Sequence, residues 1–396
     1  MVTGIGTVGA AGAGFGAFTA ALDGGSFALS EVEPHASLSR SGDPRQALLV
    51  PPGATDEWIA PRDARRMCPS SRLAVTAARM AVRDAELEPQ QVRGERTAVC
   101  LGTAWGSMTY SVRLLEQLHG QGALAISPML FTETVANAPA GQVALDLGAR
   151  GANGTVSQRE ASGLLAVAQG AAWISAGRAE RVLVGAVDEL CPVLFAVLAR
   201  FGALAPDGRA RPLDARSSGA TAAEGATVLV LEDEELAAAR GAEPKARLET
   251  WARANDPSAS PSDWGSGSAR LGAKLAAALA RADCDPRSFS RVLSGASGAR
   301  RGDRLEAGVL RELFGSAPPT LLAPKALVGE YGGNFLAASL WGLATRASPA
   351  ALATERPEPQ LGLASTGGAA LPPAERVLVS SLAVGGAAAW LVWGQP

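Results

Sequence analysis

The chain contains few histidines and cysteines, which are frequent proton-transfer groups, nucleophiles and metal ligands. Two histidines occur among 396 residues, so a mechanism that needs two convergent imidazoles must use His35 and His119 or none. The four cysteines are widely separated and form no C-x-x-C pair: Cys68, Cys100, Cys191 and Cys284. This spacing argues against a disulfide framework and a zinc site. We therefore expect buried thiols, no metal and no cofactor.

One glycine motif has the spacing of a dinucleotide-binding turn. Gly4-Ile5-Gly6-Thr7-Val8-Gly9 matches G-x-G-x-x-G, but only three residues precede it, too few for a full strand. The acidic residue expected about 20 positions later would be Asp23, within a glycine-rich stretch. We expect a tight turn leading into a helix over residues 15–22, and no nucleotide site.

Composition and charge exclude several classes of function. Hydrophobic residues make up 47% and charged residues 19%, which predicts a folded chain with a sizeable core. Lys and Arg total 36 against 38 Asp and Glu, and no basic block is present, so nucleic acid is not an expected partner. The first residues lack the pattern of a signal peptide, and no long apolar run predicts a membrane span. We expect a cytoplasmic protein.

Helix and strand patterns recur in the two halves of the chain. Residues 72–86 have helical spacing and precede an apolar strand at 97–102, and residues 274–285 precede a strand at 291–295 in the same way. Four residues of the first unit match four of the second at an offset of 197 positions: Ala85, Glu86, Glu88 and Pro89 with Ala282, Asp283, Asp285 and Pro286. The repetition predicts a layered α/β architecture built from two duplicated halves.

Further apolar runs predict the remaining core strands. They lie at residues 181–186, 227–232, 376–381 and 390–393, bounded by Gly, Pro or charged residues. Stretches rich in Gly, Pro, Ser or charge at 23–62, 255–268 and 347–373 predict loops. We expect one half over residues 1–240 and the other over residues 241–396.

The segment over residues 135–170 carries the clearest functional pattern. It predicts a helix that ends near Gly148, a short strand at Thr155-Val156, and a second helix that starts around Glu160. Free backbone N–H groups at such a strand-to-helix turn stabilise negative charge.

At this point the sequence resembles the β-ketoacyl synthases of the thiolase superfamily. The resemblance rests on five short motifs in the family's order: Val2 to Gly6, Asn137 with Ala140-Gly141-Gln142, Arg211-Pro212-Leu213-Asp214 with Gly219 and Glu224-Gly225, Lys325 to Gly329, and Ser380 to Gly386. It implies a thiolase-like fold with five layers in the order α-β-α-β-α.

By this resemblance the family's three catalytic positions are all substituted. Glu160 stands at the position of the nucleophilic cysteine, Glu330 at one histidine and Ser297 at the other, although the spacing from Ser297 to Asp303 is two residues shorter than usual. Decarboxylative condensation needs a thiolate to hold the acyl chain and imidazoles to stabilise the enolate and oxyanion. Glutamate supplies neither, so we expect no independent condensing activity.

The role of Glu160 itself stays open at this stage. A carboxylate near a helix start is favoured by the helix dipole and could simply fill a disused pocket. Alternatively, Glu330 lies beside it and the two carboxyl groups share a proton, which raises one pKa into the range of a general acid. A third reading is an ion pair with Arg159 or Lys325.

Within the family the pattern resembles the chain length factor of type II polyketide synthases, in which the cysteine is commonly replaced by glutamine. The resemblance implies a heterodimer with an active ketosynthase, visited by an acyl carrier protein that carries the polyketide chain. It further implies that a helix within residues 104–118 lines a substrate tunnel at the dimer interface, with the floor formed by Ser107, Tyr110, Leu114 and Phe131. The same residues could equally belong to an ordinary amphipathic helix.

Two other functions are compatible with the sequence. The chain could be an acyltransferase or cyclase that uses Glu160 with Glu330 or Ser297. It could also be a structural homodimer or scaffold.

Overall fold

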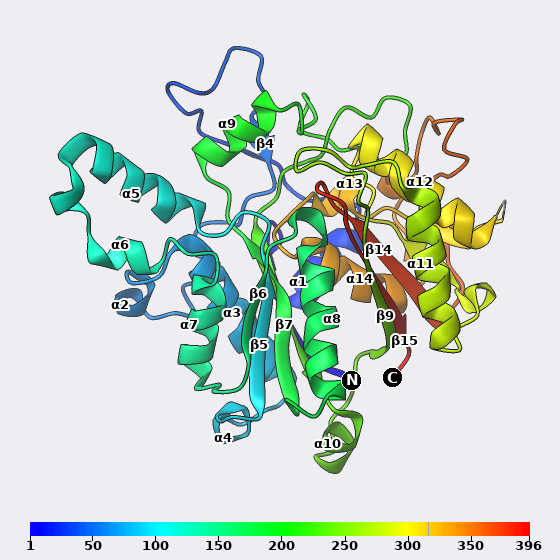
Figure 1. Cartoon of the computed structure of the whole chain (residues 1–396), viewed down its shortest axis with the longest axis horizontal. Coiled ribbons are helices and arrows are strands. Elements are labelled where there is room, and N and C mark those ends of the chain that lie inside the picture. Colours follow the sequence, from blue (N-terminus) through cyan, green and yellow to red (C-terminus); the bar gives the residue numbers. More distant parts are fainter. Residues whose placement is uncertain (316) are drawn as a thin grey trace.

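Two β-sheets form the framework of the computed structural model, which describes residues 1–315 and 317–396 (Figure 1). The first sheet has six strands, in the order β2 (Gly12–Ala13), β1 (Val2–Gly9), β8 (Gly225–Glu232), β7 (Arg181–Asp188), β5 (Thr97–Gly102) and β6 (Asn153–Val156). Strands β7, β5 and β6 run parallel, whereas β1 and β7 each pair with β8 in antiparallel fashion.

The second sheet has five strands and belongs to the C-terminal part of the chain. Its order is β11 (Thr320–Leu322), β10 (Arg291–Leu293), β14 (Arg376–Leu382), β15 (Ala387–Gly394) and β9 (Arg247–Asn255). The first sheet uses residues 2–232 and the second uses residues 247–394, so our proposed division at residue 240 falls between them.

Helices cover both sheets and also separate them. The helices α3 (Pro69–Asp84) and α7 (Ala138–Leu147) pack on the outer face of the first sheet, and α11 (Ser268–Arg281) and α12 (Arg300–Phe314) pack on the second. Between the sheets lie α8 (Ser162–Ser175) and α14 (Asn334–Ala344), which contact strands of both. This arrangement confirms the expected five-layer thiolase-like fold.

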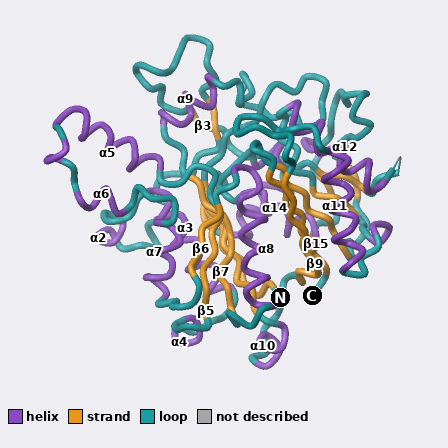
Figure 2. Tube along the Cα trace, viewed as in Figure 1, coloured by secondary structure: helices purple, strands orange, loops and turns teal. Residues whose placement is uncertain are grey.

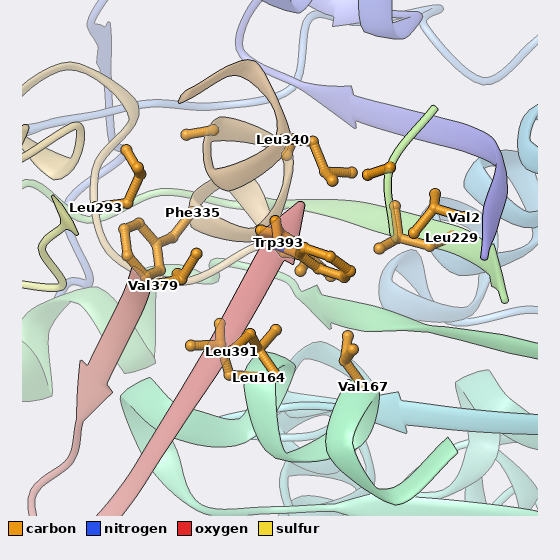
Figure 3. Packing of buried hydrophobic residues seen from close by; sticks show 14 of the residues in the cluster. Val2, Leu164, Val167, Leu229, Leu293, Phe335, Leu340, Val379, Leu391 and Trp393 are labelled. Carbon is orange, nitrogen blue, oxygen red and sulfur yellow. The ribbon is translucent and has the colours of Figure 1, made fainter. Parts of the chain in front are cut away.

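The central core explains why so many strands are continuous apolar runs. Figure 3 shows Leu164 and Val167 of α8 and Phe335 and Leu340 of α14 packed with residues from both sheets, among them Trp393. Strands covered on both faces bury every residue, as β7, β8 and β15 do. The predicted strands in these segments are confirmed.

The remaining helices and turns lie mostly around the edges of the two sheets (Figure 2). The α-helices are α1 (Phe15–Asp23), α2 (Pro61–Ala64), α4 (Pro89–Val92), α5 (Met108–Gln121), α6 (Pro128–Thr132), α9 (Pro192–Arg200), α10 (Glu234–Ala239) and α13 (Lys325–Val328). Short 3-10 turns are η1 (Ala123–Ala125), η2 (Arg159–Ala161), η3 (Pro286–Ser288) and η4 (Ala350–Leu352). Two small hairpin pairs, β3 (Ser30–Glu31) with β4 (Gln46–Ala47) and β12 (Ala347–Ser348) with β13 (Ala369–Ala370), lie within predicted loops.

The glycine motif at the N-terminus is a strand, and the expected tight turn is wrong. Residues Val2–Gly9 form the buried strand β1 beneath α3. A Cβ added at Gly4 would lie 2.1 Å from the carbonyl oxygen of Ala81, and one at Gly6 would lie 2.0 Å from that of Ala77. The glycines therefore allow a helix to approach the strand closely, and no phosphate-binding turn is formed.

The internal duplication is visible in the backbone. Glu86 and Asp283, the pair at equivalent positions in the two halves, both adopt a left-handed conformation, with φ of 54° and 51°. Each follows the C-terminal residue of a helix, α3 or α11, and each precedes a proline that begins a short helical turn. The repeated residues thus form the same helix-ending turn twice.

Strand β9 is the longest strand that the sequence pattern missed. It lies at the edge of the second sheet, is largely half-buried and carries Arg247, Glu249 and Arg253, so it has no continuous apolar run.

No helix in the described part of the chain has the length and apolar character needed to span a membrane.

Candidate functional site

Glu160 lies at a sharp turn between β6 and the central helix α8. Arg159, immediately before it, has a φ of 49°, and the 3-10 turn η2 leads into α8 at Ser162. The predicted short strand and second helix are confirmed, with Glu160 in the turn before the helix rather than within it. Strand-to-helix turns of this kind present a side chain above the end of a sheet.

Both carboxylate oxygens of Glu160 accept hydrogen bonds from neutral donors. The Tyr331 hydroxyl donates to Oε1 at 3.2 Å, and the backbone N–H of Val384 donates to Oε2 at 3.1 Å. The Ser381 hydroxyl donates to the main-chain carbonyl of Glu160 at 2.9 Å. The carboxylate therefore takes up a backbone N–H from the segment between β14 and β15, which lies beside the turn.

Glu330 forms a buried ion pair next to Glu160. Its Oε1 lies 2.6 Å from Nζ of Lys325, and both side chains are almost completely buried. The ammonium group also lies 4.9 Å from the ring centroid of Phe335. The other oxygen, Oε2, is buried and has no hydrogen-bond partner among the described residues.

Glu160 and Glu330 line the same small cavity, together with residues of α8, β7 and α14. Burial, and next the charge of Glu330, raise the pKa of Glu160 to about 7, while nearby backbone N–H groups and Lys325 act in the opposite direction. The direction agrees with the reading in which paired carboxyl groups share a proton, although burial is the larger cause. The ion pair proposed for Glu160 is not formed: Lys325 pairs with Glu330, and Arg159 stacks on Trp105.

Tyr331 and Arg159 line this cavity, and Trp105 packs against both of them. The ring of Tyr331 packs edge-on against Trp105 with 5.6 Å between centroids, and the Arg159 guanidinium lies 4.1 Å from the centre of a Trp105 ring. The cavity has a volume of about 30 Å³. That volume accommodates about one water molecule and is too small for an acyl chain. We call Tyr331, Trp105 and Arg159 the cap.

Asp188 anchors two of the three loops that carry the cap, those of Trp105 and Tyr331. Its Oδ1 accepts hydrogen bonds from the Thr103 hydroxyl and from the N–H groups of Ala104 and Trp105, and its Oδ2 accepts one from Gly332. Burial raises the pKa of Asp188 to about 6 despite these four donors. The side chain therefore fixes the position of these two loops.

Ser297, the third substituted position, is not among the residues that line the cavity. It is buried in the loop after β10, where its N–H donates to Oδ1 of Asp303 at 3.0 Å. The same carboxylate accepts the N–H of Leu213. In this structure Ser297 belongs to a loop held by Asp303.

The four residues expected to form a tunnel floor are divided between a buried base and an exposed arm. Ser107 is buried and caps the start of α5, where its hydroxyl lies 3.2 Å from Sγ of Cys68. The Tyr110 hydroxyl donates to the carbonyl of Met67 at 3.2 Å, and Leu114 is half-buried further along α5. Phe131, on α6, is 62% exposed.

The helices α5 and α6 form an arm that projects from the layered body (Figure 1). The exposed large apolar side chains of the chain are concentrated here: Leu115, Leu124, Met129, Phe131 and Val135. Only Leu145 and Phe201 are comparable elsewhere in the described residues. A cluster of this kind marks an interaction surface.

The cysteines lie apart from the cavity. All four are free and buried, and burial raises the pKa of the Cys68 and Cys100 thiols, the latter to about 12. Within the described residues, no group of three or more His, Cys, Asp or Glu side chains is placed to hold a metal ion.

Comparisons with known proteins show which proteins this chain is similar to. Residues 50–237 match the profile of the β-ketoacyl synthase N-terminal domain. The whole chain superimposes on the ishigamide ketosynthase/chain length factor with a TM-score of 0.91 and 27% identity, covering 100% of this chain and 98% of that one. The chain is similar in sequence and in fold to β-ketoacyl synthases.

Other relatives have the same fold. The chain is 29% identical over 363 residues to a polyketide beta-ketoacyl synthase 2 of Streptomyces halstedii, covering 87% of this chain and 83% of that protein. It is 27% identical to the 3-oxoacyl-(acyl-carrier-protein) synthase 2 of Staphylococcus aureus over a segment that spans 66% of each protein. A β-ketoacyl synthase structure from Burkholderia phymatum, 24% identical, superimposes with a TM-score of 0.88 over 100% of this chain and 98% of that one.

The sequence analysis did not identify the three cap residues or Val384, whose backbone N–H donates to Glu160. One signal was present: the chain has only two tyrosines, and one of them, Tyr331, directly follows Glu330. Trp105 and Val384 carry no comparable signal, because their roles depend on loops brought together from three distant parts of the chain.

Proposed function

We propose that this chain is a catalytically silent ketosynthase-like subunit, a chain length factor, that pairs with an active ketosynthase in type II polyketide biosynthesis. The observation that carries the proposal is the position and hydrogen bonding of the Glu160 carboxylate. Its carboxylate fills the turn where the family places a cysteine, and it takes up the N–H of Val384. Four independent features support the proposal.

The first supporting feature is chemical. Condensation needs a nucleophile that accepts the acyl chain and donors that stabilise developing negative charge. Here the surrounding groups are Glu160, Glu330 and Lys325, and no thiol or imidazole lines the cavity. A carboxylate beside a forming enolate would raise its energy rather than lower it.

The second supporting feature is the exposed arm. Apolar side chains on α5, η1 and α6 lie in contact with water in the isolated chain, Leu124 most fully. Their burial against a partner would contribute about 25 cal/mol for each Å² of apolar surface. An active ketosynthase subunit is the partner that the family resemblance implies.

The third supporting feature is the edge of the first sheet. Strand β6 pairs with β5 on one side, and it is the last strand of the sheet. Its segment Asn153–Val156 carries no charged residue to block pairing. A partner subunit could continue the sheet along this edge, next to the turn that holds Glu160.

The fourth supporting feature is the orientation of the arm. Ser107, Tyr110 and Leu114 follow one side of α5 from its buried base outward, and Phe131 extends from α6. We propose that in the heterodimer these four side chains form the floor of the tunnel that receives the growing polyketide or polyene chain. An acyl carrier protein would deliver that chain, and the free thiols fit a cytoplasmic setting.

Co-expression with candidate ketosynthases tests the proposal. We expect a stable heterodimer on size-exclusion chromatography and polyketide product only when both subunits are present, as measured by mass spectrometry. A homodimer that never exchanges with a ketosynthase would contradict the proposal and favour a structural scaffold.

Tyr110→Ala tests the tunnel floor. The change removes a ring from the side of α5 and should let the reconstituted pair form a longer product, read as added two-carbon units by mass spectrometry. The matched control is Tyr110→Phe, which loses only the hydrogen bond to Met67 and should leave product length unchanged. An unchanged product from the alanine variant would remove Tyr110 from the floor.

One observation favours a second function, an acyltransferase or cyclase that uses Glu160 with Glu330. The pKa of Glu160 near 7 is suited to a general acid or base. Turnover of an acyl thioester by the isolated chain, abolished in Glu160→Ala, would support this function over the silent subunit.

A further inference from the structure

The backbone after Glu330 adopts a conformation that disfavours a tyrosine. Tyr331, Gly332 and Gly333 have φ values of 79°, 68° and 71°, so three successive residues lie in the left-handed region. Glycine enters this region freely, whereas a bulky side chain there is a clear outlier. Such strain costs on the order of 1–3 kcal/mol and persists only where the surrounding structure imposes it.

Packing of the two glycines imposes the conformation. A Cβ at Gly332 would lie 2.6 Å from the carbonyl carbon of Glu224, and one at Gly333 would lie 2.5 Å from the carbonyl oxygen of Ala186. The N–H of Gly332 is held by Asp188 at 3.2 Å. The segment is therefore pressed against the ends of β7 and β8, and a glycine at position 331 would fit the backbone with less strain.

The side chain of Tyr331 accounts for a tyrosine at this position. Its hydroxyl holds Glu160, its ring packs on Trp105, and Trp105 is in turn covered by Arg159. Glu330, the preceding residue, lines the same cavity of about 30 Å³, and its Oε2 is buried without a partner among the described residues. The Tyr331 ring thus separates the opening at the Glu160 turn from the cavity, where Oε2 of Glu330 is an unpaired hydrogen-bond acceptor.

We propose that Tyr331 is a size-selective plug, which admits a water-sized hydrogen-bond donor to Glu330 but excludes an acyl chain from the chamber. The inference rests on the proposed function, because a silent subunit in a heterodimer must leave the partner's chain no blind branch to enter. It adds a steric block to the loss of the nucleophile. Restoring a thiol at position 160 would therefore be insufficient to let large groups enter.

A cysteine placed at position 160 reports directly on the plug. The full-length Glu160→Cys variant is treated with a small reagent, methyl methanethiosulfonate, and with a bulky fluorescein maleimide, and labelling is followed by intact mass. The native cysteines are all buried, so wild-type protein gives the background. We compare this variant with Glu160→Cys/Tyr331→Gly, in which glycine suits the local φ, and with Glu160→Cys/Tyr331→Phe.

The plug predicts a size-dependent result. Tyr331→Gly should raise the rate of labelling by the bulky reagent by about tenfold or more, a barrier change of about 1.4 kcal/mol, and should change the rate with the small reagent much less. Tyr331→Phe keeps the ring and should match the Glu160→Cys parent with both reagents. Equal acceleration of both reagents by Tyr331→Gly, or acceleration by Tyr331→Phe, would overturn the steric role.

A second variant covers the case in which Tyr331→Gly does not fold, as judged by circular dichroism and thermal unfolding. Glu160→Cys/Trp105→Ala removes the other ring of the cap and should produce the same size-selective acceleration; no acceleration would overturn the plug. These measurements use the chain alone. Failure to pair with a ketosynthase would contradict the proposed function without changing them, and a failed labelling result would leave pairing untouched.

Discussion

The chamber around Glu160 and the α5–α6 arm differ in which side chains they bury and which they expose to water. The chamber buries charge: Lys325 is 1% exposed and Glu330 is 4% exposed. The arm exposes apolar surface, with Leu124 and Phe131 standing out from it. Both arrangements are unfavourable for an isolated soluble domain. The chamber compensates within the chain through an ion pair and hydrogen bonds, whereas the apolar side chains of the arm stay exposed in the isolated chain.

This difference indicates where the chain acts. A pocket that keeps one unpaired acceptor, Oε2 of Glu330, and has room for about one water molecule has little capacity to bind a substrate. A projecting arm with unpaired apolar side chains has the properties of an interface. The following predictions test each side of the comparison, in order of decreasing effect.

Breaking the buried ion pair should give the largest effect. Lys325→Met leaves the Glu330 carboxylate buried without its cation and should lower the free energy of unfolding by about 3–5 kcal/mol, measured by urea denaturation. The double variant Lys325→Met/Glu330→Gln should recover much of this loss. The matched control is Arg287→Met, which breaks an exposed pair with Asp285 and should cost far less, because exposed ion pairs add little to stability. Equal losses in the two single variants would mean that the chamber is open to water.

Placing a charge on the arm should come next. Leu124→Asp should weaken pairing with the ketosynthase by about 2–4 kcal/mol if the residue lies in the buried centre of the interface, measured as the Kd of the heterodimer. The free energy of unfolding of the isolated chain should stay within about 0.5 kcal/mol, because the side chain contacts water. Phe201→Asp, at the end of α9 and 81% exposed, is the control and should leave the Kd unchanged. Similar weakening by both variants would show that the arm is not the specific contact.

The pH dependence of stability should show a smaller effect from the chamber. The pKa of Glu160 is raised in the folded chain to about 7 from an ordinary 4.5, so the folded state holds a proton that the unfolded state releases. The stabilisation from that proton is complete below about pH 4.5 and is lost as the pH rises to about 7. Glu160→Gln should remove about 1–3 kcal/mol of this decline, which allows for the partial exposure of the side chain.

Unfolding curves of wild type and Glu160→Gln at a series of pH values measure that difference. The declines caused by Asp188 and Asp303, whose pKa values burial raises to about 6 and about 7, should remain in both proteins. Parallel curves for the two proteins would contradict a buried, proton-holding Glu160.

Much of the fold could be predicted from the sequence because the central strands are covered on both faces. The strand β5 was predicted with its observed ends, since its six residues are all buried and apolar runs therefore mark it. The edge strand β9 has one half-exposed face with charged residues and gives no such run. The N-terminal glycines misled for a different reason: their effect is to let α3 approach β1, a contact between distant parts of the chain.

Residues of the site could be predicted only where they stand at a position of a sequence motif that normally carries another residue. Glu160 and Glu330 were identified in that way, and the structure brings them to one cavity. Tyr331 was not, because its importance lies in a backbone conformation set by the contacts of Gly332 and Gly333 with β7 and β8. Whether Ser107, Tyr110, Leu114 and Phe131 form a tunnel floor depends on a second chain, which no single sequence describes.

Acylation measured by mass spectrometry shows whether this chain itself accepts and extends an acyl group. The isolated chain and the heterodimer are each incubated with an acyl carrier protein loaded with a radiolabelled acyl group, and malonyl donor is then added. If the chain is catalytically silent, no acyl group is transferred to it in either sample. All covalent label in the heterodimer then lies on the ketosynthase partner. Label on this chain, with formation of an extended product in the absence of the partner, would show that the chain is not silent.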